Sequence, residues 1–300
     1  MKKSILALIL LSLIIVSGVA GCPSQEQSKA QESAGLAVSF AKDAPPVSVA
    51  VNQEFPIYIE VLNKGGDFVN AGDAKFYLVG AVPNLEGVKT SVTNERSLSK
   101  LSPSFSPDRI SFADKAKFTT QIPSLFTLTM ALTSCYTYGT TAQAELCVSA
   151  RNESTVCSTQ GDKISASSNS IAPIQITSLT EKVEGSKLQV LFNIENKLGG
   201  QVYLKTTDCD KVLAKDLSES FKEDKVNLEI RVPSAEGFQC KLLSDSSPYS
   251  PTDGLSGVAD LGTVACEKTL KGTENYKLPF IIILRYKYLE SAPKTVSVAP

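Results

Sequence analysis

The cysteines are the residues of this chain best suited to covalent chemistry. The sequence has 300 residues, with seven cysteines and no histidine. Six cysteines lie beyond Cys22: Cys135, Cys147, Cys157, Cys209, Cys240 and Cys266. None forms a Cys-x-x-Cys pair and no histidine can complete a mixed zinc site, so the pattern favours neither redox catalysis nor a metal centre. An even number is typical of structural disulfides in an oxidising compartment.

Other reactive groups are sparse. Without histidine the chain lacks the commonest acid–base group near neutral pH, and no Gly-x-Ser-x-Gly sequence marks a nucleophilic serine. The net charge of −1 leaves no basic excess for neutralising phosphates. We therefore predict a protein that is not an enzyme, needs no cofactor and binds no nucleic acid.

Two weaker site candidates lie in expected loops. Asn152 begins the sequon Asn-Glu-Ser, a candidate for glycosylation in an exported protein. Several loop carboxylates could in principle bind calcium through oxygen ligands, namely Asp208, Asp210, Asp245, Asp253 and Asp260. Their spacing does not match a calcium-binding loop, so we predict a solvated acidic surface and no metal site.

The start of the chain predicts where the protein resides. Two lysines, an apolar run and small residues before Cys22 describe an export signal over residues 1–21. Val-Ala-Gly-Cys at residues 19–22 resembles the lipobox of prokaryotic lipoproteins, which implies lipid attachment to Cys22. Residues 22–35 have the composition of a flexible tether. The alternatives are an uncleaved membrane anchor, or an ordinary signal peptide that leaves Cys22 as a thiol.

The rest of the chain must position these residues, and its pattern is that of β-strands. Apolar Phe55, Ile57, Ile59 and Val61 alternate with polar-type positions before a turn signal at residues 63–66. Similar patterns predict strands over residues 74–79, 115–121, 125–138, 141–149, 174–179, 187–196, 201–206, 226–232, 262–267, 276–288 and 294–298. Residues 211–221 are expected to form only a helical turn or two. The fold class that follows is all-β.

The sequence also contains an internal repeat. Ile57, Ile59, Val61 and Asn63 match Val190, Phe192, Ile194 and Asn196 at an offset of 133 residues. A long alternating segment closed by Tyr136 and Tyr138 matches one closed by Tyr286 and Tyr288, at an offset of 150. Because two features recur in the same order, we predict two copies of one domain.

The repeated motifs resemble the immunoglobulin-like domains of prokaryotic surface proteins, especially adhesion-type modules whose second strand ends in Val-x-Asn-x-Gly. Residues 61–65 have this pattern, and residues 194–199 have it with one extra residue. The resemblance implies two tandem β-sandwich domains, over residues 36–170 and 171–300. We expect the asparagine to cap a turn, the glycines to supply positive φ, and the tyrosines to lie in the core with bonded hydroxyls.

This division places three cysteines in each copy, so they cannot all pair within their own domains. Either one bridge crosses between the domains, or each domain keeps a free thiol, or a thiol pairs with another molecule. Our hypothesis pairs Cys147 with Cys157, Cys209 with Cys240, and Cys135 with Cys266. The last bridge would cross the interface and hold the two sandwiches in one orientation.

The strand at residues 280–284 is apolar on both faces. Its outer side chains, Ile281 and Ile283, form a candidate interface that packs on the first domain, on the loop at residues 248–257 or on a partner.

Together these patterns predict an exported, membrane-anchored protein of the cell surface that reaches the membrane through a lipid anchor. Its two sandwiches would bind another envelope or surface protein, or form a structural part of an envelope or appendage assembly. The alternatives are a lipoprotein that captures a solute or ligand, and an enzyme without a recognisable motif.

Overall fold

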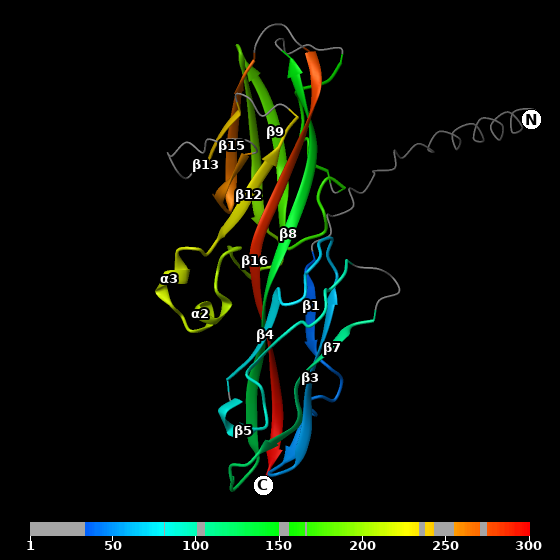
Figure 1. Cartoon of the computed structure of the whole chain (residues 1–300), viewed down its shortest axis with the longest axis vertical. Helices are drawn as coiled ribbons and strands as arrows, with labels where there is room; N and C mark the ends of the chain where they lie inside the picture. Colours follow the sequence, from blue (N-terminus) through cyan, green and yellow to red (C-terminus); the bar gives the residue numbers. More distant parts are fainter. Residues whose placement is uncertain are drawn as a thin grey trace, which may run out of the picture. The chain divides into compact units, whose positions relative to one another are not determined.

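The computed structural model describes residues 34–80, 82–100, 106–149, 156–165, 167–233, 238–242, 255–270 and 275–300. β-Strands make up most of this part of the chain, as the arrows in Figure 1 show. Residues 31–300 belong to one compact unit. In the described ranges, no helix is both long enough and apolar enough to cross a membrane. The predicted signal at residues 1–21, and all but the last two residues of the predicted tether, lie outside the described residues.

The first half of the unit contains eight strands and one short helical turn. In chain order they are β1 (Leu36–Phe40), β2 (Ser48–Ala50), β3 (Glu54–Asn63), β4 (Ala74–Gly80), the 3-10 turn η1 (Val82–Asn84), β5 (Leu85–Glu86), β6 (Ser91–Thr93), β7 (Asp108–Phe118) and β8 (Phe126–Ser149). β3 shows why these segments are strands, because its apolar residues alternate with half-exposed ones along its whole length.

The second half repeats this order with one insertion, but its described residues include no counterpart of β2. Its elements are β9 (Ile174–Glu184), β10 (Lys187–Asn196), β11 (Gln201–Leu204), α2 (Cys209–Leu213), α3 (Leu217–Ser220), β12 (Lys225–Arg231), β13 (Phe238–Leu242), β14 (Leu255–Asp260), β15 (Gly262–Thr269) and β16 (Asn275–Ala299). The two helices are short, and Asp208 and Asp216 cap their first turns by accepting backbone N–H bonds.

The sheets of the two halves have the same strand order. One four-stranded sheet runs β1-β3-β7-β5, and its counterpart in the second half runs β9-β10-β15-β13. The third sheet, of eight strands, contains the path β14-β12-β16-β8-β4-β6, with β11 and β2 also paired to β16. The path reads alike from both ends, because β8 pairs with β4 and β4 with β6, just as β16 pairs with β12 and β12 with β14. This agreement supports the predicted duplication.

The long strands β8 and β16 join the two halves. They pair antiparallel without interruption, from Phe126 opposite Val298 to Ser149 opposite Asn275, and lie side by side in Figure 1. The start of β8 therefore belongs with the first half and its end with the second, whereas β16 runs the opposite way. The predicted domains at residues 36–170 and 171–300 thus share one sheet.

Several predicted strands are confirmed and others need correction. β10 has the predicted bounds, and β4, β9, β12 and β15 lie within a few residues of theirs. The predicted pairs of strands at residues 125–138 and 141–149, and at residues 276–288 and 294–298, are wrong as separate strands, because each pair forms one strand. Gly139, between the first two, lies inside β8. A Cβ at Gly139 would collide with Arg285, which pairs with Asp67 beside it.

The α2–α3 insertion, residues 205–224, interrupts one strand of the second half. Leu204 of β11 lies opposite Tyr286, and Asn227 of β12 lies opposite the next residue, Arg285. The insertion reaches back to the first half, where Asp210 accepts a hydrogen bond from the Tyr77 hydroxyl at 2.9 Å. Lys75 also contacts Asp210 at 2.7 Å and holds the pKa of that carboxyl below its usual value.

The disulfides correct part of the pairing hypothesis. Cys147 bonds Cys157 as predicted, but Cys135 bonds Cys209 and Cys240 bonds Cys266. Cys240 and Cys266 face each other directly across β13 and β15, so their pairing follows from strand register. Cys209 begins α2, and its bond to β8 fastens the α2–α3 insertion to the first half. One bridge therefore does join the two halves, with Cys209 in place of the expected Cys266.

We expect the Cys135–Cys209 bridge to stabilise the fold more than Cys147–Cys157, because their sequence separations are 74 and 10 residues. Loop-closure entropy predicts a loss of about 4 kcal/mol in the free energy of unfolding for C135A/C209A and about 3 kcal/mol for C147A/C157A. Urea denaturation of both double variants measures the difference. An equal or larger loss for C147A/C157A would contradict this order.

Candidate functional site

Four tyrosines meet near the midpoint of the paired strands β8 and β16. Tyr136 lies opposite Tyr288 and Tyr138 lies opposite Tyr286, and all four side chains are fully buried. The Tyr136 and Tyr288 ring centroids are 5.8 Å apart, as are those of Tyr136 and Tyr138. These contacts place the repeated tyrosine pairs in the core, as predicted.

Each tyrosine hydroxyl bonds at the edge of the core. Tyr138 donates to Asn63 Oδ1 at 2.9 Å, and Tyr288 donates to Asn196 Oδ1 at 3.3 Å. Both asparagines also bond nearby backbone groups, and Asn63 accepts from the Gly65 N–H at 3.0 Å. The predicted turn-capping role is confirmed. These four residues serve the fold, because burial raises the pKa of Tyr288 to about 12 and keeps its hydroxyl neutral.

The predicted role of the glycines holds in one copy only. Gly199 has φ near +77°, which favours glycine. Gly65 has no positive φ; a Cβ there would collide with the Tyr138 hydroxyl instead. In the first copy the glycine is therefore needed for a close approach of the backbone to the tyrosine.

A buried ion pair lies in the second half. Glu181 of β9 is buried, and its carboxylate accepts the Cys147 N–H at 2.9 and 3.0 Å. Lys163 Nζ lies 3.1 Å from Glu181 Oε1. Burial raises the pKa of this carboxyl, and the backbone bond and the lysine oppose that shift. The acid is thus satisfied within the fold, and we assign it a structural role.

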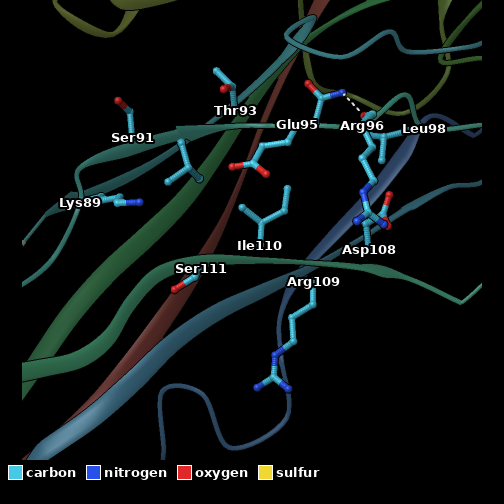
Figure 2. A pocket seen from close by; sticks show the side chains of 12 residues that line it. Lys89, Ser91, Thr93, Glu95, Arg96, Leu98, Asp108, Arg109, Ile110 and Ser111 are labelled. Atoms are coloured by element: carbon cyan, nitrogen blue, oxygen red, sulfur yellow. Dashed lines mark hydrogen bonds between the residues drawn. The ribbon is translucent and has the colours of Figure 1, made fainter.

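One cleft lies between β7 and the segment that begins with β6 (Figure 2). Its volume is about 590 Å³, within the size range of small-molecule sites. Asn94 anchors one wall, because it accepts the Ala74 N–H at 2.9 Å and donates to the Arg96 carbonyl at 2.8 Å, the bond dashed in Figure 2. Ile110 of β7 lies on the opposite wall.

The charges around this cleft are mixed and mostly exposed. Lys89, Arg96 and Arg109 are exposed cations, while Glu95 and Asp108 are the acids of the lining. The Arg109 guanidinium stacks on the Tyr58 ring at 4.1 Å from its centroid. Among the lining residues, no histidine or cysteine is present to act as a base or nucleophile. The cleft suits weak polar contacts better than catalysis.

A second cleft, the β1–β16 cleft, opens beside β1 and has a volume of about 420 Å³. Its lining includes Leu36 and Val38 of β1, Leu132 and Ser134 of β8, and Glu290 and Ser291 of β16. Ser134 and Glu290 face each other across the two strands, at positions where the neighbouring residues point into the core. Ser134 is buried, and its Oγ has no hydrogen-bond partner among the described residues.

Glu290 is the acid of this cleft with the largest change in its pKa. Burial raises the pKa of its carboxyl to about 7. Its side chain is half-buried, and no described cation forms an ion pair with it. Ser134 beside it opposes this shift without cancelling it. The cleft therefore combines an acid of raised pKa with a neighbouring buried serine.

Apart from the cysteines of the three disulfides, the predicted site residues that the structure describes do not form one site. Cys22 and Asn152 lie outside the described residues, as do Asp245 and Asp253. Ile283 is buried within the unit and Ile281 is half-buried, so Ile283 is not exposed for an interface. Asp260 pairs with Lys225 at 2.6 Å. In the described part of the chain, no group of three acidic or cysteine side chains is arranged to hold a metal ion.

Sequence reasoning missed both Ser134 and Glu290. A signal was present, since each is the polar residue at a position where strand alternation requires an apolar one. Ser134 interrupts the series Leu128, Met130, Leu132, and Glu290 follows Tyr286 and Tyr288 in the same register. A polar residue at such a position marks either an internal bond or an opening of the core.

Comparison with known proteins identifies no relative. No protein-family model and no curated protein matches the chain. Among solved structures, the secreted serine protease VesC from Vibrio cholerae has 9% sequence identity and a TM-score of 0.19, over 82% of this chain and 49% of the protease. The matched region spans about half of that protease, and a likeness this low carries no argument about fold or activity.

We expect Glu290 to make stability depend on pH. Its pKa rises from an ordinary 4.5 to about 7 in the folded state, so between these values the folded protein holds a proton that the unfolded chain has lost. The free energy of unfolding should therefore fall as pH rises through this window. E290Q removes this contribution and should gain stability relative to wild type from pH 5 to pH 8, as measured by urea denaturation.

Glu86→Gln serves as the control, because Glu86 is exposed. A difference between wild type and E290Q that stays constant from pH 5 to pH 8 would contradict the raised pKa.

Proposed function

We propose that this chain is a non-catalytic surface lipoprotein, anchored through Cys22, that binds another envelope or surface protein or forms part of an envelope assembly. The observation that carries the proposal is that the described cysteines, the core tyrosines and Glu181 are engaged within the fold. All six described cysteines are in disulfides, the core tyrosines bond backbone or asparagine, and Glu181 pairs with Lys163. Three disulfides are typical of an oxidising, extracytoplasmic compartment.

We further propose that each half is an immunoglobulin-like module that has exchanged its last strand with the other. In the first half, β1 pairs with β3 in one sheet and β2 pairs with β16 in the other, so consecutive strands cover both sheets. The end of β16 completes the first half, and the end of β8 completes the second. Such exchange favours a rigid body for display over two hinged domains.

Capture of a small ligand is the second candidate, favoured by the size of the cleft in Figure 2. Its lining of exposed charges argues for weak binding, because tight small-molecule sites are mostly apolar and enclosed. A rise in melting temperature of several degrees with one solute from a metabolite panel would favour this candidate over protein binding.

The lipid anchor is tested by C22S. We expect the wild-type chain to lose residues 1–21 and to enter the detergent phase on phase separation, because lipid on Cys22 supplies the anchor. C22S should keep the leader, as its mass shows. Identical mature masses and identical partitioning of both forms would contradict lipidation. Retention of the leader by both forms would indicate the uncleaved anchor.

The partner is tested by cross-linking the full chain in its native membrane, with photoreactive residues at several exposed positions. We expect one envelope protein to be captured from at least one face, in amounts comparable to the chain. Capture of no protein from any face would contradict the proposed function.

A further inference from the structure

The β1–β16 cleft lies between two strand edges that have no strand neighbour. β1 bonds β3 through alternate residues, as the Lys64 N–H to Gly35 carbonyl bond at 2.9 Å shows. The backbone groups of Val38 and Phe40 therefore point away from β3. Leu36, on the same edge, donates its N–H to the Tyr136 hydroxyl at 3.2 Å. Within the described residues, neither Val38 nor Phe40 has a backbone partner on this side.

The facing edge belongs to β16. β11 pairs with β16 up to Leu289, and β2 pairs with it from Ser297 onward. Between these points, residues 290–296 have β8 on one side and no described strand on the other. The cleft is thus an open seam between the two sheets of the first half.

The same seam in the second half is closed by the chain itself. The covering segment, residues 157–165 and 167–170, precedes β9 and bonds both edges. Lys163 donates its N–H to the Leu179 carbonyl of β9 at 2.7 Å, and Gln143 of β8 donates to the Ser168 carbonyl at 2.9 Å. An extended polypeptide is therefore the natural occupant of this kind of seam.

The covering segment also supplies side chains. Lys163 pairs with the buried carboxylate of Glu181, and Ile164 packs against the core. In the first half, Glu290 lines the seam beside Ser134. Lys64 lines it too, but no ion pair joins Glu290 to a described cation. The first half thus has the acid of such a site without its basic partner.

The second half holds a smaller polar residue at the position that matches Glu290. At the offset of 150, Glu290 corresponds to Thr140, whose hydroxyl donates to the Ile174 carbonyl at 2.5 Å and so makes an internal bond. The larger carboxylate instead lies at the opening of the seam.

We infer that the β1–β16 cleft binds an extended segment of a partner protein, which adds as a strand along β1 and places a lysine or arginine beside Glu290. This mode supplies main-chain hydrogen bonds to Val38 and Phe40 and a cation to the unpaired acid. The inference rests on the proposed protein-binding function. The tether of this chain is a poorer occupant, because residues 23–33 contain no large apolar side chain to match Ile164.

A display library of random decapeptides, selected on the full-length chain in detergent, tests the inference. We expect the enriched peptides to carry a basic residue at one fixed position and to alternate apolar residues around it. Their affinity should fall about tenfold or more on E290Q, because a charge-assisted contact is lost. It should also fall on V38P, whose proline removes an outward N–H without breaking a bond to β3. E86Q should bind them as wild type does.

Three results would overturn the inference. No peptide is enriched, or the enriched peptides lack a basic residue, or E290Q and V38P bind them as wild type does. Binding seen only after deletion of residues 23–33 would assign the seam to the tether and overturn the partner. If the partner captured in native membranes binds E290Q and V38P unchanged, the seam is refuted while the proposed function stands. Melting curves confirm that both variants are folded.

Discussion

The uninterrupted pairing of β8 with β16 is the constraint on which the rest of the structure depends. Each strand contributes to both halves, so neither half has a complete sheet without the other. The four tyrosines fill the core at the middle of this pairing. The hydroxyls of Tyr138 and Tyr288 bond the asparagines that end β3 and β10, and those of Tyr136 and Tyr286 accept the N–H groups that begin β1 and β9. Strand pairing, aromatic packing and turn geometry are thereby fixed by one cluster of residues.

The α2–α3 insertion adds a second connection between the halves. It leaves the second half between β11 and β12 and is fastened to the first by the Cys135–Cys209 bond and by the contacts of Asp210 with Lys75 and Tyr77. The shared strands and this covalent bond oppose any hinge motion between the halves. A rigid body of this kind suits display of a fixed surface to a partner.

The local structure was predictable where short patterns decide it. The alternation in residues 187–196 defined β10, and the repeated Asn63 and Asn196 indicated the turns that they cap. Long-range features were not predictable. The place of Gly139 inside β8, beside Arg285 and Asp67, depends on residues more than seventy positions away in sequence. The partner of Cys209 likewise depends on where the insertion folds back.

The β1–β16 cleft was beyond sequence reasoning for a related reason. Ser134 and Glu290 break the alternation, yet the sequence does not reveal that they face each other or that β1 leaves an edge open beside them. The covering segment closes the matching seam only in the second half, which the sequence alone does not reveal. The internal duplication is informative here, because the seam between the sheets is covered in the second half and open in the first.

Native-state hydrogen exchange tests the central claim most directly, that the two halves form one cooperative unit through β8 and β16. The account predicts that the slowest amides of β3 and β10, one strand from each half, open with the same free energy, equal to that of global unfolding. Opening of β10 amides at a clearly lower free energy while β3 amides stay protected would contradict it, because the halves would then unfold separately.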